Sequence, residues 1–202
     1  MILKNKGLML KTFLYQIVMS FFGIMMFTAT SQNQFLLILG QALVILFYYY
    51  ILFSQSSQYG WKTCERDCAH CTTSSPFFGF FPAIISFLPA ILLSLISFLN
   101  PPYAADGTAI FASPFIINKT FLQGMYIGIA QQLYPTTTIV AQTSASENAA
   151  ALNSQTFLYL FSSIPGILLT GAGYLTGYLR FAAKKRISHH GQNATAPQQK
   201  EE

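Results

Sequence analysis

Residues 12–61 read TFLYQIVMSFFGIMMFTATSQNQFLLILGQALVILFYYYILFSQSSQYGW and contain no Asp, Glu, Lys or Arg. About 20 predominantly apolar residues cross the hydrocarbon core of a bilayer as a helix, so this stretch has room for two crossings. A charged side chain at the centre of such a helix costs roughly 2.5–3.5 kcal/mol on insertion scales. The stretch therefore predicts an integral membrane protein.

Four apolar runs predict four transmembrane helices, over residues 12–29, 35–53, 77–99 and 157–179. The short uncharged connection between the first two predicts an antiparallel hairpin. The first run also has the basic flank of a secretory signal, but it is longer than a usual signal core and a second apolar run follows at once, which favours an uncleaved helix. We expect an all-α membrane helix bundle over residues 1–186.

The composition agrees with this class and limits the partners. The chain is 52% hydrophobic and 8% charged, whereas a soluble domain is about 25% charged. Its net charge of +5 comes from basic residues that flank apolar runs, which argues against a nucleic-acid partner. The expected partners are the lipid bilayer and a homo-oligomer or larger membrane complex, and no cofactor is predicted.

The distribution of basic residues predicts the orientation. With four spans, one side receives all of the 11 Lys and Arg residues except Lys119. The positive-inside rule then places both termini in the cytoplasm and the chain in the cell membrane. A fifth span over residues 108–130 would bury Lys119 in mid-membrane and export the basic C-terminal segment, so we reject it.

The extramembrane segments divide into an outer segment and a tail. Residues 100–156 form the outer segment, in which residues 121–134 place Phe121, Leu122, Met125 and other apolar side chains on one side of a helix. This pattern predicts an amphipathic helix at the outer membrane surface. Residues 187–202 lack an apolar pattern and are expected to form a disordered cytoplasmic tail.

A polar loop expected over residues 54–75 carries Cys64, Cys68, His70 and Cys71. The C-x3-C-x2-C spacing is that of a radical SAM iron–sulfur loop, but no residues remain for the large soluble barrel of such an enzyme. Three thiolates and one imidazole suit zinc, although His70 and Cys71 are adjacent and adjacent side chains rarely reach the same ion. Three interpretations stay open: small buried side chains, a metal or cluster site, and a redox or lipid-modification site.

Polar and small residues inside the predicted spans indicate helix contacts. Gly166, Thr170, Gly173 and Gly177 lie at offsets of four, three and four, which is one helical stripe. Small residues at this spacing let helices approach closely, either within the bundle, which we favour, or in a homodimer. Gln16 and Gln41 are each expected to make interhelical hydrogen bonds, and tyrosines 48–50 are expected at headgroup level.

The stretch LFYYYILFSQSSQYGWKTCERD, residues 46–67, is followed by a proline-containing span, a polar outer segment and a glycine-rich last span with basic residues at its end. In this arrangement the chain resembles a group of small, uncharacterised four-span bacterial membrane proteins. The resemblance implies four spans and no particular activity.

The expected function is that of a non-enzymatic accessory, scaffolding or regulatory component. The predicted spans contain no Asp, Glu, Lys, Arg or His, the groups on which proton relays and ion-coupled transport usually depend. Neither a nucleophile–base pair nor a phosphate-binding glycine loop is evident. Two alternatives remain: an oligomeric transporter or channel subunit for neutral or apolar solutes, and a redox or metal sensor that uses Cys64, Cys68 and Cys71.

Overall fold

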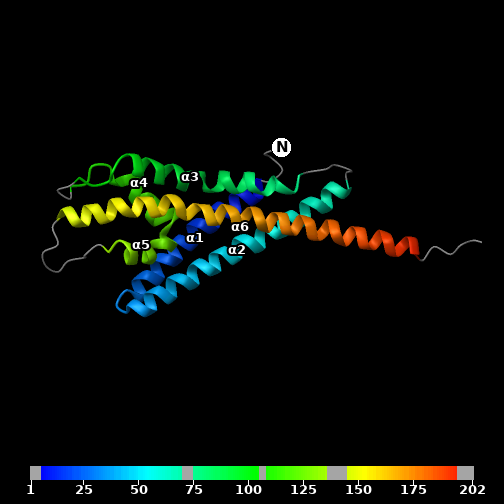
Figure 1. Ribbon diagram of the computed structural model, residues 1–202, viewed down its shortest axis with the longest axis horizontal. Helices are drawn as coiled ribbons and strands as arrows, with labels where there is room; N and C mark the ends of the chain where they lie inside the picture. Colours follow the sequence, from blue (N-terminus) through cyan, green and yellow to red (C-terminus); the bar gives the residue numbers. More distant parts are fainter. Residues whose placement is uncertain (1–5, 70–74, 105–107, 136–144, 195–202) are drawn as a thin grey trace, which may run out of the picture.

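The structure, a computed structural model, describes residues 6–69, 75–104, 108–135 and 145–194. The elements named in these ranges are all helical, which confirms the all-α class. The four long helices are α1 (Lys6–Thr30), α2 (Gln34–Ala69), α3 (Phe80–Leu99) and α6 (Ala145–Ala194) (Figure 1). Each is long and apolar enough to cross a membrane, as the four apolar runs predict.

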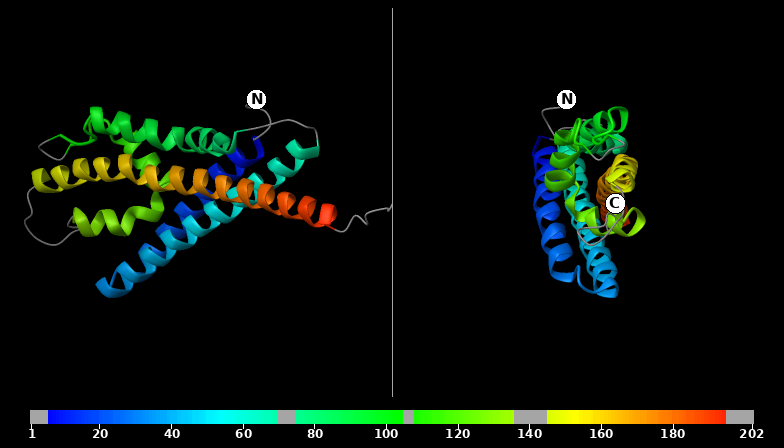
Figure 2. Two further views of the ribbon diagram at one scale, coloured as in Figure 1. Left: turned by 45° about the vertical axis from the view of Figure 1, so that its right-hand side comes forward. Right: turned by 90° about the vertical axis from the view of Figure 1, so that its left-hand side faces the viewer.

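The four long helices form one bundle in which α6 packs along both α2 and α3 (Figure 2). Helices α1 and α2 form the predicted antiparallel hairpin. Asn33 begins α2, because its side-chain oxygen accepts hydrogen bonds from the backbone N–H groups of Phe35 at 3.0 Å and Leu36 at 3.3 Å. Such a cap satisfies donors that the first helical turn leaves without partners.

The bundle has two chemically different ends. At the first, the start of α1 meets the end of α2, where Lys11 Nζ lies 5.6 Å from the ring centroid of Tyr59. Trp61 of α2 and Phe181 of α6 meet at the same end, with ring centroids 5.1 Å apart. We call this the basic end. The opposite end, which holds the turn between α1 and α2, is the far end.

Helices α2 and α6 are longer than the predicted spans. Helix α2 continues to Ala69, so most of the expected polar loop over residues 54–75 is helical. Helix α6 extends from Ala145 to Ala194 and includes residues expected in the outer segment and in the disordered tail; residues 195–202 lie outside the described residues. A helix can continue beyond its apolar part, and the alanines near both ends of α6 favour the helical conformation there.

A broken helical segment occupies residues 112–133, which we call the inserted segment. It comprises α4 (Ala112–Ile117), the π-helical turn η3 (Asn118–Leu122), the 3-10 turn η4 (Gly124–Tyr126) and α5 (Ile127–Leu133). Turns η3 and η4 pack against α1, α4 against α3, and α5 against α2. The single amphipathic helix predicted over residues 121–134 is therefore wrong, because the chain bends at Gln123 (φ −130°, ψ 20°) and is buried on several sides.

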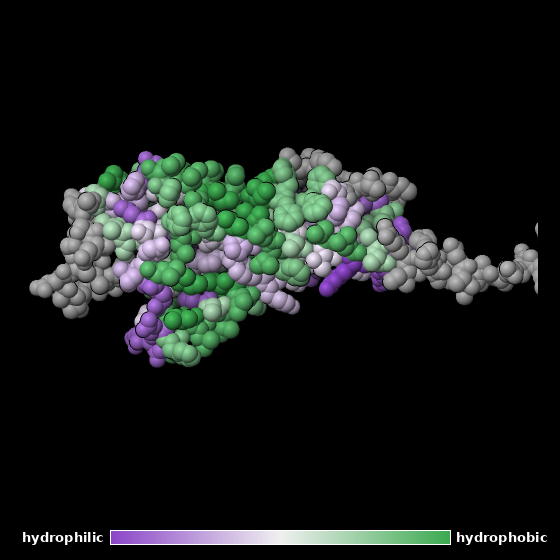
Figure 3. All heavy atoms as spheres, viewed as in Figure 1, coloured by the Kyte–Doolittle hydropathy of each residue, from purple (hydrophilic) through white to green (hydrophobic). Residues whose placement is uncertain are grey.

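Large apolar side chains are exposed along all four long helices. Leu14, Phe47, Leu88 and Leu168 are between 44% and 55% exposed. Figure 3 shows apolar side chains across the middle of one face of the bundle. A surface of this kind is typical of a protein surrounded by lipid or by other apolar surfaces, not by water.

Candidate functional site

A chain of buried polar side chains joins the inserted segment to α3 and α6. Asn118 Nδ2 donates to Ser94 Oγ of α3 at 2.7 Å and to Gln123 Oε1 at 3.4 Å. Gln123 Nε2 in turn donates to Ser163 Oγ of α6 at 2.8 Å. All four side chains are 1% exposed. Hydrogen bonds between buried polar groups avoid a large desolvation penalty, so this network fixes the segment in place.

Gln41 joins the inserted segment to the hairpin of α1 and α2. Its Nε2 donates to the backbone oxygen of Gly23 in α1 at 3.0 Å, and its Oε1 accepts from the backbone N–H of Gly128 in α5 at 3.4 Å. This confirms the interhelical hydrogen bond expected for Gln41, whereas Gln16 Oε1 has no hydrogen-bond partner among the described residues. A side chain at Gly23 would meet the backbone of Met125, so glycine allows α1 and the inserted segment to touch.

Tyrosines form a third part of the site. The hydroxyl groups of Tyr49 and Tyr126 are 2.8 Å apart, and Tyr126 also donates to the backbone oxygen of Ser162 at 3.2 Å. Tyr48 is fully buried and Tyr50 is exposed. Tyr48 thus points into the bundle, and α2 continues well beyond the three tyrosines. Their expected position at headgroup level stays a prediction.

Lys119 is partly buried within the inserted segment. Its Nζ donates to Gln155 Oε1 of α6 at 3.2 Å and lies 5.6 Å from the ring centroid of Phe115. Gln155 also donates to the backbone oxygen of Tyr134 at 3.0 Å. Burial lowers the pKa of the Lys119 amine, because desolvation disfavours its charged form.

Several buried polar atoms have no hydrogen-bond partner within the described part of the chain. They come from α1, α2, the inserted segment and α6, and they are Gln16 Oε1, Ser20 Oγ, Tyr48 OH, Asn118 Oδ1 and Tyr159 OH. Buried polar groups are usually satisfied by protein or by ordered water. Internal water molecules would complete the polar interior at these positions.

The predicted cysteine cluster lies at the basic end, on α2. Cys64 is buried and Cys68 is partly buried one helical turn later, both as free thiols; Cys71 lies outside the described residues. The Cys64 thiol hydrogen-bonds with the hydroxyl of Tyr178 on α6. Among the described residues, no three His, Cys, Asp or Glu side chains are grouped to hold a metal ion. A metal or redox role stays a prediction.

The predicted glycine stripe of α6 lies inside the bundle. A side chain at Gly166 would meet the Phe87 ring of α3, and side chains at Gly173 and Gly177 would meet backbone oxygens of α2. Thr170, between them, is fully buried and donates to the backbone oxygen of Gly166 at 2.7 Å. Neighbouring helices of the same chain occupy this stripe, so a second copy cannot also pack on it.

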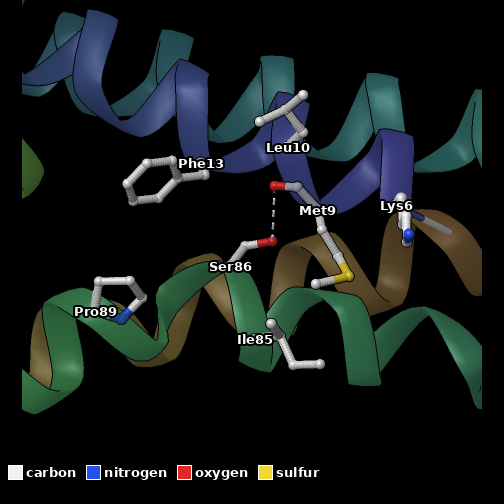
Figure 4. A pocket seen from close by; sticks show the side chains of 7 residues that line it. All are labelled: Lys6, Met9, Leu10, Phe13, Ile85, Ser86 and Pro89. Atoms are coloured by element: carbon white, nitrogen blue, oxygen red, sulfur yellow. Dashed lines mark hydrogen bonds between the residues drawn. The ribbon is translucent and has the colours of Figure 1, made fainter. Parts of the chain in front are cut away.

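An apolar groove of about 300 Å³ runs between α1 and α3 at the basic end (Figure 4). Lys6 stands at one end of the groove, and Phe13 and Pro89 stand at the other. Ser86 Oγ donates to the backbone oxygen of Met9 at 3.1 Å and links the two helices there. The groove adds an apolar recess to the outer surface of the bundle.

A site at Asn118, Gln123, Ser94 and Ser163 was not predicted from the sequence. The available signal was weak: Asn118 and Gln123 are uncharged polar residues within apolar surroundings. No protein-family model, curated protein or solved structure matches the chain.

Proposed function

We propose that the chain is a four-span protein of the cell membrane, with both termini in the cytoplasm. The apolar faces of α1, α2, α3 and α6 support this proposal, as does the gathering of basic residues at the end where α1 begins. The basic end would face the cytoplasm and the far end would face the outside. An even number of spans would put both termini on one side.

Thiol labelling tests this orientation. In a Cys71→Ser background, Cys68 is expected to react with a membrane-impermeant maleimide only after cells are opened, because it would face the cytoplasm. Cys64 is expected to stay protected, since it is only 3% exposed. The Cys68→Ser variant is the control and should remove the label. Labelling of Cys68 in intact cells would overturn the orientation.

For the role of the protein, we propose a non-enzymatic accessory, scaffolding or regulatory component of the membrane. One observation carries this: buried hydrogen bonds of Gln123, Asn118 and Gln41 tie the inserted segment to α6, α3 and α2, and Gln41 also bonds to α1. Such a bundle is rigid and presents fixed apolar faces to its surroundings. A preorganised surface is what an interaction partner binds with least loss of entropy.

Site-specific photo-crosslinking tests the accessory role. A photoactivatable residue is placed at Phe47 on α2, Leu88 on α3 or Leu168 on α6, all exposed and apolar. We expect one of these positions to give a cross-link to one discrete membrane protein or to a second copy of the chain. The other two positions serve as controls. A specific interface covers one face of the bundle, so these positions should not cross-link to the same partner. Cross-links to lipid alone from all three faces would contradict the proposal.

Transport of neutral solutes is the second candidate, and the broken backbone of the inserted segment favours it. Irregular backbone within a membrane bundle occurs where it is buried in protein or lines a water-filled space. We expect vesicles that contain the purified protein to take up glycerol no faster than protein-free vesicles. Saturable uptake of glycerol by vesicles that contain the protein would establish transport instead.

A further inference from the structure

A basic, partly aromatic pocket lies at the basic end between α2 and α6, away from the buried polar network. Its volume is about 230 Å³, and its lining residues are Ser57, Gln58, Trp61, Lys62 and Arg180. The first four belong to two successive turns of α2, and Arg180 comes from α6. The pocket is therefore shared by two helices that lie far apart in the sequence but cross at this end (Figure 1).

The crossing of α2 and α6 builds the pocket. Gly177 lies directly against the backbone of Ser57, and one turn later Trp61 meets Phe181 edge to face, with an interplanar angle of 86°. Lys184 Nζ lies 5.6 Å from the centroid of the Trp61 ring. The helices thus separate beyond the glycine contact, and aromatic rings fill part of the space between them.

Three cations lie in or beside the pocket. Lys62 and Arg180 line the pocket and Lys184 stacks on Trp61, whereas no acidic side chain is among the lining residues. Glu65 lies one turn beyond Trp61 on α2, outside the lining. A site with this excess of positive charge is selective for an anion.

The donor groups specify which anion fits. A guanidinium and an ammonium group together bind a phosphate, and Ser57 and Gln58 supply further hydrogen-bond donors. Phe47 lies three turns before Gln58 on the same face of α2 and is exposed and apolar. At Phe47, about three turns from the pocket, the exposed surface of α2 is therefore apolar. Tryptophan between such a surface and a polar end suits the interface between lipid and water.

We propose that this pocket binds the phosphodiester headgroup of an anionic glycerophospholipid, with the acyl chains on the apolar face of α2. Lys62 and Arg180 neutralise the phosphate, and Trp61 lies against the glycerol region. The proposal rests on the membrane location proposed above, because that membrane would supply the lipid. The binding itself is measured in detergent, so a failure here leaves that location untouched.

Trp61 reports on the pocket directly, because the chain contains one tryptophan. The full-length protein in a neutral detergent is titrated separately with phosphatidylglycerol, phosphatidylcholine and inorganic phosphate. We expect a saturable change in tryptophan emission with phosphatidylglycerol, and one retained phosphatidylglycerol by native mass spectrometry. Phosphatidylcholine and inorganic phosphate are expected to give neither. Equal saturation by inorganic phosphate would assign a free-anion site and overturn the proposal, as would the absence of a retained lipid.

Charge variants separate a built site from a general attraction. Lys62→Gln and Arg180→Gln are each expected to weaken phosphatidylglycerol binding about fivefold. Both side chains are exposed, so melting temperatures should stay close to that of the wild type. Lys6→Gln removes the same charge at the same end outside the pocket and should leave the affinity unchanged. If Lys6→Gln weakened binding as much as Arg180→Gln, the attraction would be diffuse and the proposal would fail.

Discussion

Replacing Gly60 or Gly177 with alanine is expected to lower the free energy of unfolding by about 1–3 kcal/mol in each case. A methyl group at Gly60 of α2 would overlap the backbone oxygen of Tyr174 and lie 3.0 Å from the backbone nitrogen of Tyr178, both in α6. A methyl group at Gly177 would overlap the backbone oxygen of Ser57. Backbone atoms cannot rotate away as side chains do, so α2 and α6 would have to separate. Thermal unfolding of the purified protein in detergent measures the effect.

Gly40→Ala is the matched control, because Gly40 also lies in α2. Its added methyl group would lie 3.2 Å from Met26 Cε, the end of a flexible side chain that can move. Alanine is favoured over glycine inside a helix by roughly 0.5–1 kcal/mol, so Gly40→Ala is expected to keep or raise the melting temperature. Similar melting temperatures for all three variants would contradict the close approach of α2 and α6.

The four long apolar helices were predictable from the sequence because their signal is strong and local. Charge is absent over residues 12–61, and apolar residues dominate the two later runs. Each charged residue that is buried in lipid costs free energy by itself. A long run without charges can therefore be recognised in one sequence, without knowledge of what the run contacts. The same reasoning found the glycine stripe, since a period of 3.6 residues needs no knowledge of the partner helix.

The ends of the helices were less predictable. A span ends at the membrane surface, whereas a helix ends where its backbone loses partners or meets a cap. In residues 54–69 the side chains become polar and then charged, which marks the end of an apolar run. The helix nevertheless continues to Ala69, because Gly60 and Trp61 pack against α6. That contact is between segments more than 100 residues apart in the chain.

The inserted segment could not be predicted from its own residues. The apolar periodicity over residues 121–134 is real, but it was interpreted as one face of a surface helix. The structure instead buries Gln123, which on a surface helix would face water, because Ser163 and Asn118 offer it partners. Which side of such a segment is buried depends on polar groups in distant helices. Periodicity carries no information about those groups.

The Gln123→Met variant is expected to be destabilised because it removes the centre of the buried network. Methionine keeps a similar length, but it takes away the donor to Ser163 and the acceptor for Asn118. A buried polar group left without a partner costs about 1–3 kcal/mol. Ser163→Ala removes the other side of the same hydrogen bond. A double-mutant cycle on melting in detergent should give a coupling energy of about 0.6 kcal/mol, with about 1.7 kcal/mol as the upper end seen in membrane bundles.

The control cycle pairs Gln123→Met with Ser154→Ala. Ser154 is also in α6, but it is only partly buried, and its hydroxyl donates to the backbone oxygen of Ala150 in its own helix, at 2.9 Å. These two changes should therefore add within about 0.3–0.5 kcal/mol. A coupling between Gln123 and Ser163 no larger than this control would mean that α6 does not hold the inserted segment at this point. The rigid connection on which the accessory role depends would then be lost.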